Sequence, residues 1–290
     1  MTKTSIEWAD EVWNPVTGCT KVSQGCKNCY AERIANRFWG ERKFTDLQMH
    51  PERLEDPLHW KKPRRVFVNS MSDLFHVDVD HEFISDVFRI MERAISHTFM
   101  VLTKRPKEML HWFNTYNAEN PLPNVWLGVS AEDQNTTDER IPDLLRTPAA
   151  VRFVSCEPLL GPVNLSPWID WRLSHIDSPQ KLDWIICGGE SGPNARPMNP
   201  DWARSLRDQC VAAEVPFFFK QFGEWAENPY YTYTTPQKGM TGPWTDSNGD
   251  VGYFIGDGIS SQNRTLKRVG KRAAGRLLYG VEWNQYPEVK

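Results

Sequence analysis

The chain has 290 residues, of which 40% are hydrophobic and 24% are charged, a balance typical of a globular protein with a sizeable core. Its formal net charge of −3 argues against a protein held to nucleic acid by bulk electrostatics, although a local basic patch is compatible with it. The first residues contain no apolar run, and no apolar stretch reaches the length of a membrane span. We therefore expect a cytoplasmic protein without a membrane segment, in which thiols stay reduced.

A C-x6-C-x2-C segment near the start holds three of the six cysteines, Cys19, Cys26 and Cys29. In a reducing compartment such clusters bind metal or carry redox chemistry more often than they form disulfides. A structural zinc site needs four protein ligands, and the nearest histidines, His50 and His59, lack metal-site spacing. Three thiolates can instead hold three irons of a [4Fe-4S] cluster and leave the fourth iron open to an external ligand. We expect these cysteines on the loop between a short strand and a helix that begins after Cys29.

Strand and helix patterns alternate after a long connection over residues 38–63. The helix expected after residue 80 has the clearest apolar face, made by Phe83, Val87, Ile90, Met91 and Ala94. A later helix is expected to begin after Asn199, because asparagine is a common helix cap. The strand patterns are continuous apolar runs, as expected of strands buried on both faces, and they occupy residues 65–75, 97–106, 124–133, 150–160, 182–192 and 215–223.

This alternation predicts βαβ units and a parallel sheet, hence an α/β fold. With the cysteine segment as the first unit there are seven strand candidates. A full or partial (β/α) TIM-type barrel of about six to seven strands fits the pattern, and so does a doubly wound sheet. We assign residues 1–223 to the barrel and residues 224–290 to a C-terminal extension that packs on it as a candidate cover for the substrate site.

The extension contains a turn-rich stretch, "TDSNGDVGYFIGDG", that predicts a β excursion, and a basic run near its end. We expect the basic run to form a short helix. It is either a solvated face or a patch that contacts phosphates, and its cations are Arg264, Lys267, Arg268, Lys271, Arg272 and Arg276.

Polar residues gather where each apolar run stops. In parallel α/β folds, ligands bind beyond the carboxyl ends of the strands, so these residues predict a polar pocket at one face of the sheet. They are Asn69, Ser70, Ser72, Asp73, Thr103, Lys104, Arg105, Ser130, Glu132, Asp133, Ser155, Glu157, Gly188, Gly189, Glu190, Ser191, Lys220 and Gln221.

A three-cysteine loop after the first strand of a βα barrel resembles the radical S-adenosylmethionine (SAM) superfamily. In that superfamily SAM binds the open iron through its amino and carboxylate groups, and electron transfer yields a 5′-deoxyadenosyl radical. Over residues 8–287 the chain is more closely similar to a phage- and prophage-associated family of radical-SAM-like proteins. The stretches that carry this resemblance are "TGCTKVSQGCKNCYAE", "VFVNSMSDLFH", "VLTKRP", "FVSCEPLLGP", "DWIICGGESGPNARPM", "PFFFKQFGEW" and "VGKRAAGRLLYGVEWNQYP".

The resemblance implies a radical SAM enzyme with a [4Fe-4S] cluster on Cys19, Cys26 and Cys29, SAM, and an electron donor such as flavodoxin or ferredoxin. The enzyme would abstract hydrogen from a substrate at the barrel mouth and so modify or rearrange it. The candidate substrate is a nucleobase, modified or not, or a nucleic acid, and a partner protein is a further candidate. If phage-encoded, the protein would act in the host cell cytoplasm. The alternative is a non-catalytic protein that binds nucleic acid or a partner, with the cysteines in a structural metal site.

The chain departs from the superfamily in two ways. The usual spacing is C-x3-C-x2-C, so the x6 gap adds three residues, and Asn28 stands where an aromatic residue usually precedes the third cysteine. The usual Gly-Gly-Glu motif after the second strand is replaced by "SMSD". By position, the resemblance therefore assigns the SAM amino group to Ser72 and Asp73.

The remaining roles follow from the same placement. Lys104 and Arg105 are assigned to the SAM carboxylate or a substrate anion. Gly188 and Gly189 either permit close approach of the adenosyl group or form a tight turn between strand and helix. Cys156 is either a buried thiol or a hydrogen-atom donor, whereas Cys187 and Cys210 are expected in the core. Glu132, Glu157 and Glu190 either bind ribose hydroxyls or substrate or form structural salt bridges inside the barrel. The catalytic candidates are Cys156 and Lys104, and the other cofactor-binding candidates are Ser70, Thr103 and Ser130.

Overall fold

The sheet that organises the chain has seven parallel strands, in the same order in space as in the sequence. The computed structural model describes residues 4, 6–116, 120–170, 180–227, 242–245, 251–254 and 266–288. The strands are β1 (Glu11–Trp13), β4 (Arg65–Val68), β5 (Thr98–Thr103), β6 (Val125–Ser130), β7 (Val151–Cys156), β8 (Trp184–Gly188) and β9 (Phe217–Gln221). A doubly wound sheet reverses its strand order, whereas a (β/α) barrel keeps it. The fold is therefore α/β with a partial TIM-type barrel.

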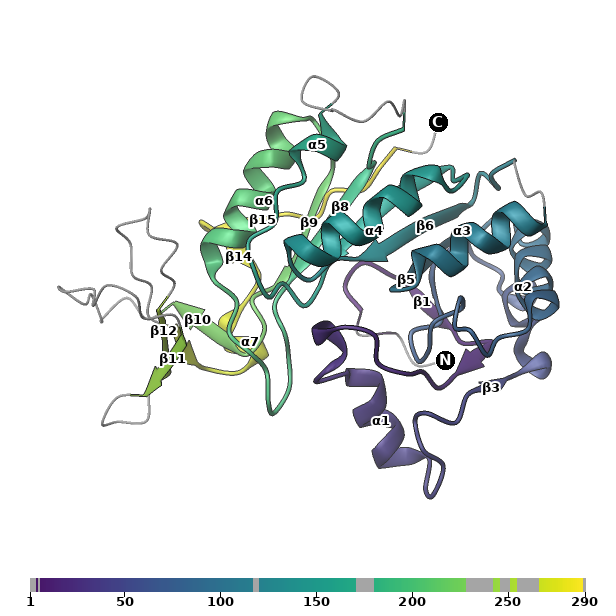
Figure 1. Ribbon diagram of the computed structural model, residues 1–290, viewed down its shortest axis with the longest axis horizontal. Coiled ribbons are helices and arrows are strands. Elements are labelled where there is room, and N and C mark those ends of the chain that lie inside the picture. The colour runs from purple at the N-terminus through teal and green to yellow at the C-terminus, as the bar shows by residue number, and fades with distance from the viewer. Residues whose placement is uncertain are drawn as a thin grey trace.

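Helices surround the curled sheet (Figure 1). The predicted apolar face of the helix over His81–Arg93 is confirmed, because Phe83, Val87 and Ile90 are buried. The Asn199 cap is confirmed as well, since its Oδ1 accepts a hydrogen bond from Asp201 N at 2.9 Å. The helices are α1 (Tyr30–Phe38), α2 (His81–Arg93), α3 (Pro106–Thr115), α4 (Gln134–Arg146), α5 (Ser166–Ile169) and α6 (Pro200–Ala212).

Alternating side chains of the strands form two apolar layers, one on each face of the sheet. The outer layer packs against the helices and includes Cys156, Cys187 and Cys210. The inner layer fills the barrel interior and holds Trp8, Phe67, Met100, Trp126, Phe153, Trp184, Ile186 and Phe218. Tyr286 packs on it, with its ring centroid 5.1 Å from that of Trp184. Residues that precede β1 and residues that follow the sheet thus contribute to one layer.

Residues 283–285 cover the free edge of β9. The backbone N of Phe219 donates to the Trp283 carbonyl oxygen at 2.9 Å. Phe218 forms an antiparallel bridge with Asn284. Among the described strands none joins β9 to β1, so the barrel stays partial and an irregular segment, not an eighth strand, covers the β9 edge.

The chain after residue 223 adds two-stranded pairs to the barrel. β10 (Trp225–Glu227) pairs with β13 (Leu266–Arg268), β11 (Gly242–Thr245) with β12 (Val251–Phe254), and β14 (Leu277–Leu278) with β15 (Val281–Glu282). The basic run is mostly not helical: it forms β13 and the four-residue helix α7 (Lys271–Ala274), and Arg264 lies outside the described residues. Gly270 and Gly275 take positive φ angles of 86° and 74° and limit the helix at both ends.

The long connection after α1 lies against the start of the chain. β2 (Val16–Thr17) pairs with β3 (Gln48–Met49). Three short 3-10 helices are also present: η1 (Gln24–Cys26), which precedes α1, and η2 (Pro51–Arg53) and η3 (Asp56–His59), which follow it. In the described part of the chain, no helix combines the length and apolarity that crossing a membrane requires.

Candidate functional site

A cavity of about 510 Å³ lies at the carboxyl ends of the parallel strands. Its base includes Trp8 and Phe67 of the inner layer. All three clustered cysteines line it, together with ten other residues to which the sequence assigned a role: Ser70, Ser72, Asp73, Thr103, Lys104, Arg105, Ser130, Glu157, Gly189 and Glu190. The structure therefore brings these residues together, whereas Glu132, Cys156 and Gly188 lie outside the lining.

The cysteine segment runs from Gly18, directly after β2, to the start of α1. Gly18 has a φ of +96°, and a side chain there would meet the Asp46 carbonyl oxygen at 2.8 Å, so only glycine fits. Cys26 ends the turn η1, and Cys29 directly precedes α1 as expected. The three thiols are half-buried. Their positions are thus set by a tight turn at one end and a helix start at the other.

Three buried carboxylates, which follow β4, β6 and β8, hold this segment through arginines. The first is Asp73, whose Oδ2 accepts a hydrogen bond from Arg105 Nη1 at 3.3 Å. Arg105 Nη2 in turn donates to the Thr20 carbonyl oxygen at 3.1 Å. A carboxylate has about four acceptor positions, and three more donors bind Asp73: Thr103 Oγ1, Phe75 N and Lys104 N. Asp73 is therefore saturated by the protein, and its predicted role as acceptor for the SAM amino group does not fit.

The second carboxylate, Glu132, is fully buried beneath the segment. Its Oε2 accepts a hydrogen bond from Arg140 Nη1 at 3.0 Å, and its Oε1 accepts one from Ser23 Oγ at 2.9 Å. A side chain on Gly25 would meet Glu132 Oε1 at 2.2 Å, so glycine is required there. Ser23 and Gly25 belong to the enlarged x6 gap, which therefore packs on Glu132. The predicted contact of Glu132 with ribose or substrate is replaced by this supporting role.

The third carboxylate, Glu190, docks the other end of the segment. Its Oε2 accepts a hydrogen bond from Asn28 Nδ2 at 2.9 Å, and its Oε1 accepts one from Arg196 Nη2 at 2.6 Å. Arg196 Nη2 also donates to the Gln24 carbonyl oxygen at 3.0 Å. Burial opposes ionisation of Glu190, but the hydrogen bonds from Arg196 and Asn28 outweigh it and hold its pKa below the ordinary value of 4.5. Asn28 thus replaces the usual aromatic with a docking contact.

Two predicted side chains in the cavity keep capacity for a ligand. Lys104 Nζ donates to Ser130 Oγ at 3.1 Å and lies 3.8 Å from Glu132 Oε1, in a side chain that is 23% exposed. Ser72 Oγ donates its hydrogen to the Val16 carbonyl oxygen at 2.7 Å, which leaves its lone pairs to accept. Lys104 can therefore bind an anionic group and Ser72 an ammonium group.

Ion pairs line the wall that follows β7 and β9. Lys220 Nζ donates to Glu157 Oε1 at 2.6 Å. Glu7 joins this pair to the C-terminal extension, because its carboxylate lies 4.0 Å from Lys220 Nζ and 3.0 Å from Lys271 Nζ. Glu157 and Lys271 thus reach the cavity from opposite ends of one row of alternating charges.

The glycines after β8 have structural explanations. A side chain on Gly189 would meet the Phe222 carbonyl oxygen at 2.1 Å, so the absence of a side chain there lets the chain after β8 lie against the chain after β9. Around Gly188 the nearest atoms, in Lys220 and Glu157, would be at ordinary contact distances of 3.4 and 3.5 Å.

Cys156 belongs to the outer layer between the sheet and the helices. Burial, and secondarily the charge of Glu132, raise the pKa of its thiol to about 12. Ser155, the preceding residue, lines the cavity, so the pleat turns Cys156 to the opposite face. The catalytic role predicted for Cys156 therefore lacks a geometric basis, while Cys187 and Cys210 lie in the core as expected.

The residues present fit a cluster bound by three thiolates. Within the described ranges, no three Cys, His, Asp or Glu groups converge on one metal position. Convergence is not required of a [4Fe-4S] cluster, because each thiolate binds a different iron. Burial and the neighbouring Asp73 raise the pKa of Cys19 to about 11 against the effect of Arg105, so this thiol keeps its proton at neutral pH until a metal displaces it.

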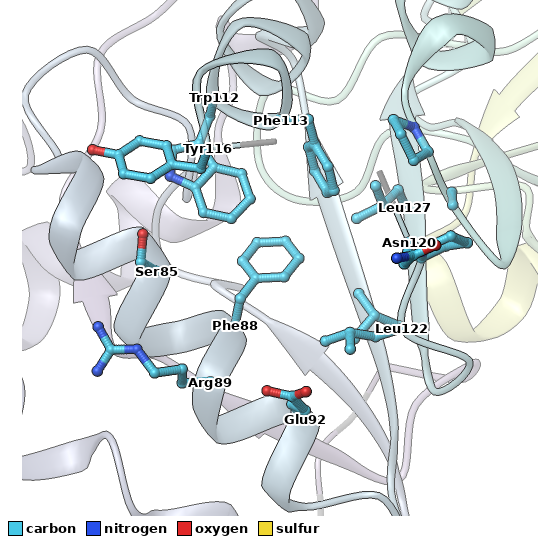
Figure 2. Close-up of a pocket in the computed structure, with 14 residues that line it drawn as sticks. Ser85, Phe88, Arg89, Glu92, Trp112, Phe113, Tyr116, Asn120, Leu122 and Leu127 are labelled. Carbon is cyan, nitrogen blue, oxygen red and sulfur yellow. The ribbon is translucent and has the colours of Figure 1, made fainter. Parts of the chain in front are cut away.

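A second cavity, of about 390 Å³, lies on the outer side of the sheet, between α2, α3 and the segment before β6. Figure 2 shows Phe88 of α2 beside Trp112 and Phe113 of α3. Phe88 stacks on Trp112 with ring centroids 4.7 Å apart. None of the predicted site residues lines this cavity, and its aromatic side chains pack α2 against α3.

Sequence reasoning missed the side chains that connect the carboxylates to the cysteine segment. Arg140 lies in α4, Arg196 lies in the loop before α6, and Ser23 lies inside the x6 gap. No periodicity marks them, because each acts through specific hydrogen bonds: Arg140 to Glu132 and the Ser130 carbonyl oxygen, Arg196 to Glu190 and the Gln24 carbonyl oxygen, and Ser23 to Glu132. The only signal was the gap itself.

The chain belongs to the family described as "Protein of unknown function (DUF5131)", whose model matches residues 3–287. No curated protein and no solved structure matches it.

Proposed function

We propose that this member of the DUF5131 family is a radical SAM enzyme that binds a [4Fe-4S] cluster through Cys19, Cys26 and Cys29. The observation that supports the proposal most is that the three thiols line one cavity at the carboxyl ends of a partial barrel. The described lining adds neither a histidine nor a fourth cysteine. With the cluster bound, the chemistry supplied would be one-electron reductive cleavage of SAM to a 5′-deoxyadenosyl radical, which abstracts hydrogen from a substrate.

The chain's own residues would bind SAM and keep water from the reacting groups. Lys104 is the candidate partner of the SAM carboxylate, since its ammonium group has three donors and donates one of them to Ser130 Oγ, with Glu132 Oε1 at 3.8 Å. Ser72 is the candidate acceptor for the amino group in place of Asp73, which is saturated. The aromatic base formed by Trp8 and Phe67 would exclude water from beneath the ligand.

We infer further that the substrate is anionic, with a nucleobase or nucleic acid as the candidate. The chain has a net charge of −3, yet the cavity lining carries six cationic side chains against three carboxylates. Part of the basic run reaches its mouth, because Lys271 lines the cavity and Arg268 Nη2 donates to the Gly192 carbonyl oxygen at 2.7 Å. Cations at a cavity mouth are suited to the phosphates of a base held inside.

Anaerobic purification with iron and sulfide reconstitution tests the proposed function. We expect a brown protein with about four irons per chain, and 5′-deoxyadenosine on reduction in the presence of SAM. Replacing Cys19, Cys26 and Cys29 by alanine should abolish both, whereas the matched variant Cys210→Ala, in the core of α6, should keep them. A colourless protein that holds one zinc and does not respond to iron would refute the proposal and support the structural metal site.

A further inference from the structure

The three cysteines do not have equivalent surroundings. Cys19 Sγ accepts a hydrogen bond from Arg105 Nη1 at 3.6 Å, so its donor is a charged guanidinium. Cys26 Sγ has the neutral hydroxyl of Ser23 at 3.9 Å. Cys29 directly precedes α1. Cys19 thus differs from Cys26 in that the hydrogen-bond donor at its sulfur is a buried, charged guanidinium and not a neutral hydroxyl.

Arg105 is held in place on every side. Arg105 is only 9% exposed, and its backbone N donates to Thr103 Oγ1 at 2.8 Å. Nη2 donates to the Thr20 carbonyl oxygen at 3.1 Å and to Thr20 Oγ1 at 2.9 Å. Because the guanidinium is planar, these contacts also fix the direction of the N–H group that points at Cys19.

A negative charge opposes this positive one at the same place. Asp73 Oδ2 lies 3.3 Å from the Nη1 atom that donates to Cys19, and the Asp73 side chain is 7% exposed. The carboxylate and the guanidinium therefore both lie near Cys19 and act on it with little screening by solvent. Reduction adds an electron to a cluster, so a nearby cation and donor favour the reduced state and a nearby anion disfavours it.

We propose that Arg105 and Asp73 set the reduction potential of the cluster with opposite signs, Arg105 raising it and Asp73 lowering it. The proposal rests on the proposed function, because it requires the cluster. Both are positioning residues: they act through Cys19. The potential at which SAM can be cleaved would then depend on the balance between these two side chains.

Potentiometric titration of the reconstituted chain without SAM, followed by electron paramagnetic resonance, tests this inference. We expect Arg105→Gln to shift the midpoint potential to more negative values and Asp73→Asn to shift it to more positive values. Lys107→Gln is the matched control, since Lys107 carries the same charge two residues away but is 71% exposed and pairs with Glu139. Its potential should equal that of the unaltered chain.

The opposite signs separate electrostatic tuning from local disorder, which would move both variants in the same direction. Arg105→Lys keeps the charge but not the planar donor, and we expect a smaller negative shift. It replaces Arg105→Gln if that variant holds no cluster. Equal potentials in the Arg105 and Asp73 variants, or shifts of the same sign, overturn this inference alone. An unaltered chain that assembles no cluster overturns the proposed function and this inference together.

Discussion

The two ends of the barrel interior are built from the same strands but in opposite ways. Toward the amino ends, inward positions carry aromatic side chains such as Trp126 and Trp184, which contact each other with ring centroids 5.7 Å apart. Toward the carboxyl ends, inward positions carry Lys104, Ser130 and Lys220, and a cavity replaces the packed layer. One end is stabilised by apolar burial and the other by hydrogen-bonded charges.

The difference indicates how a rigid barrel can present a polar site. We call the aromatic end, at the amino ends of the strands, the closed end, and the end with the cavity the open end. Packing at the closed end fixes the strands, so the loops at the open end need few apolar contacts of their own. Those loops are instead fixed by Asp73, Glu132 and Glu190, each buried and each bonded to an arginine. The order of the cysteine segment should therefore depend on these pairs, and the stability of the whole chain mainly on the aromatic layer.

The closed end should show the largest effect on stability. Trp184 is fully buried and its ring contacts those of Trp8, Trp126, Phe153, Phe218 and Tyr286. Trp184→Ala leaves a cavity and should lower the free energy of unfolding by about 4 kcal/mol. Urea denaturation followed by circular dichroism measures this. Trp184→Phe keeps most of the volume and should cost clearly less; a loss below about 1 kcal/mol for the alanine variant would contradict the assignment.

At the open end, breaking one carboxylate–arginine pair should have a somewhat smaller effect. Glu132→Gln keeps the shape but leaves Arg140, whose side chain is 4% exposed, without its carboxylate. We expect a loss of about 3 kcal/mol by the same urea measurement. Adding Arg140→Met removes the unpaired charge and should restore part of the lost free energy of unfolding. If the double variant were less stable than the single one, the pair would not be the cause.

The smallest effect should come from protonating Glu190. The pKa of Glu190 is lowered in the folded chain, so its ionised form contributes stability above the ordinary value of 4.5, and this contribution is lost as pH falls through the lowered pKa. The gap in unfolding free energy between the unaltered chain and Glu190→Gln should thus narrow below pH 4.5. The loss of unfolding free energy in Glu190→Gln should be smaller than that in Glu132→Gln, because Arg196 is 27% exposed and stays partly solvated. Urea titrations at several pH values measure it, and a constant gap would be inconsistent with this linkage.

Much of this architecture could be predicted from the sequence, because apolar runs and their polar ends follow general rules for parallel sheets. The parallel strands, the polar cavity and the placement of Cys29 before α1 needed no knowledge of side-chain partners, whereas the apolar runs left the strand orders of a barrel and of a doubly wound sheet both open. The roles of Asp73 and Glu132 could not be predicted in this way. A carboxylate at a strand end is a ligand for a cofactor only if the protein has not already filled its acceptor positions, and the arginines that fill them come from elsewhere in the chain.

Cys156 shows a different limit. The pleat requires Ser155 and Cys156 to face opposite sides of the sheet. Because β7 is buried on both faces, its sequence does not reveal which face is the barrel interior. The x6 gap is a third case. Its unusual length was a signal that the segment differs, but the sequence did not indicate which residue the gap contacts. Its explanation is a contact between Gly25 and Glu132, which are more than a hundred positions apart.

The cover over β9 has a consequence for biosynthesis. Residues 283–285 are translated long after β9, so a nascent chain on the ribosome presents the unpaired edge of Phe217, Phe218 and Phe219 until residues 283–285 emerge. An apolar strand edge of this kind is a template for association between chains. Translation that stops short of residue 283 should therefore yield a product that aggregates, however complete the rest of the barrel is.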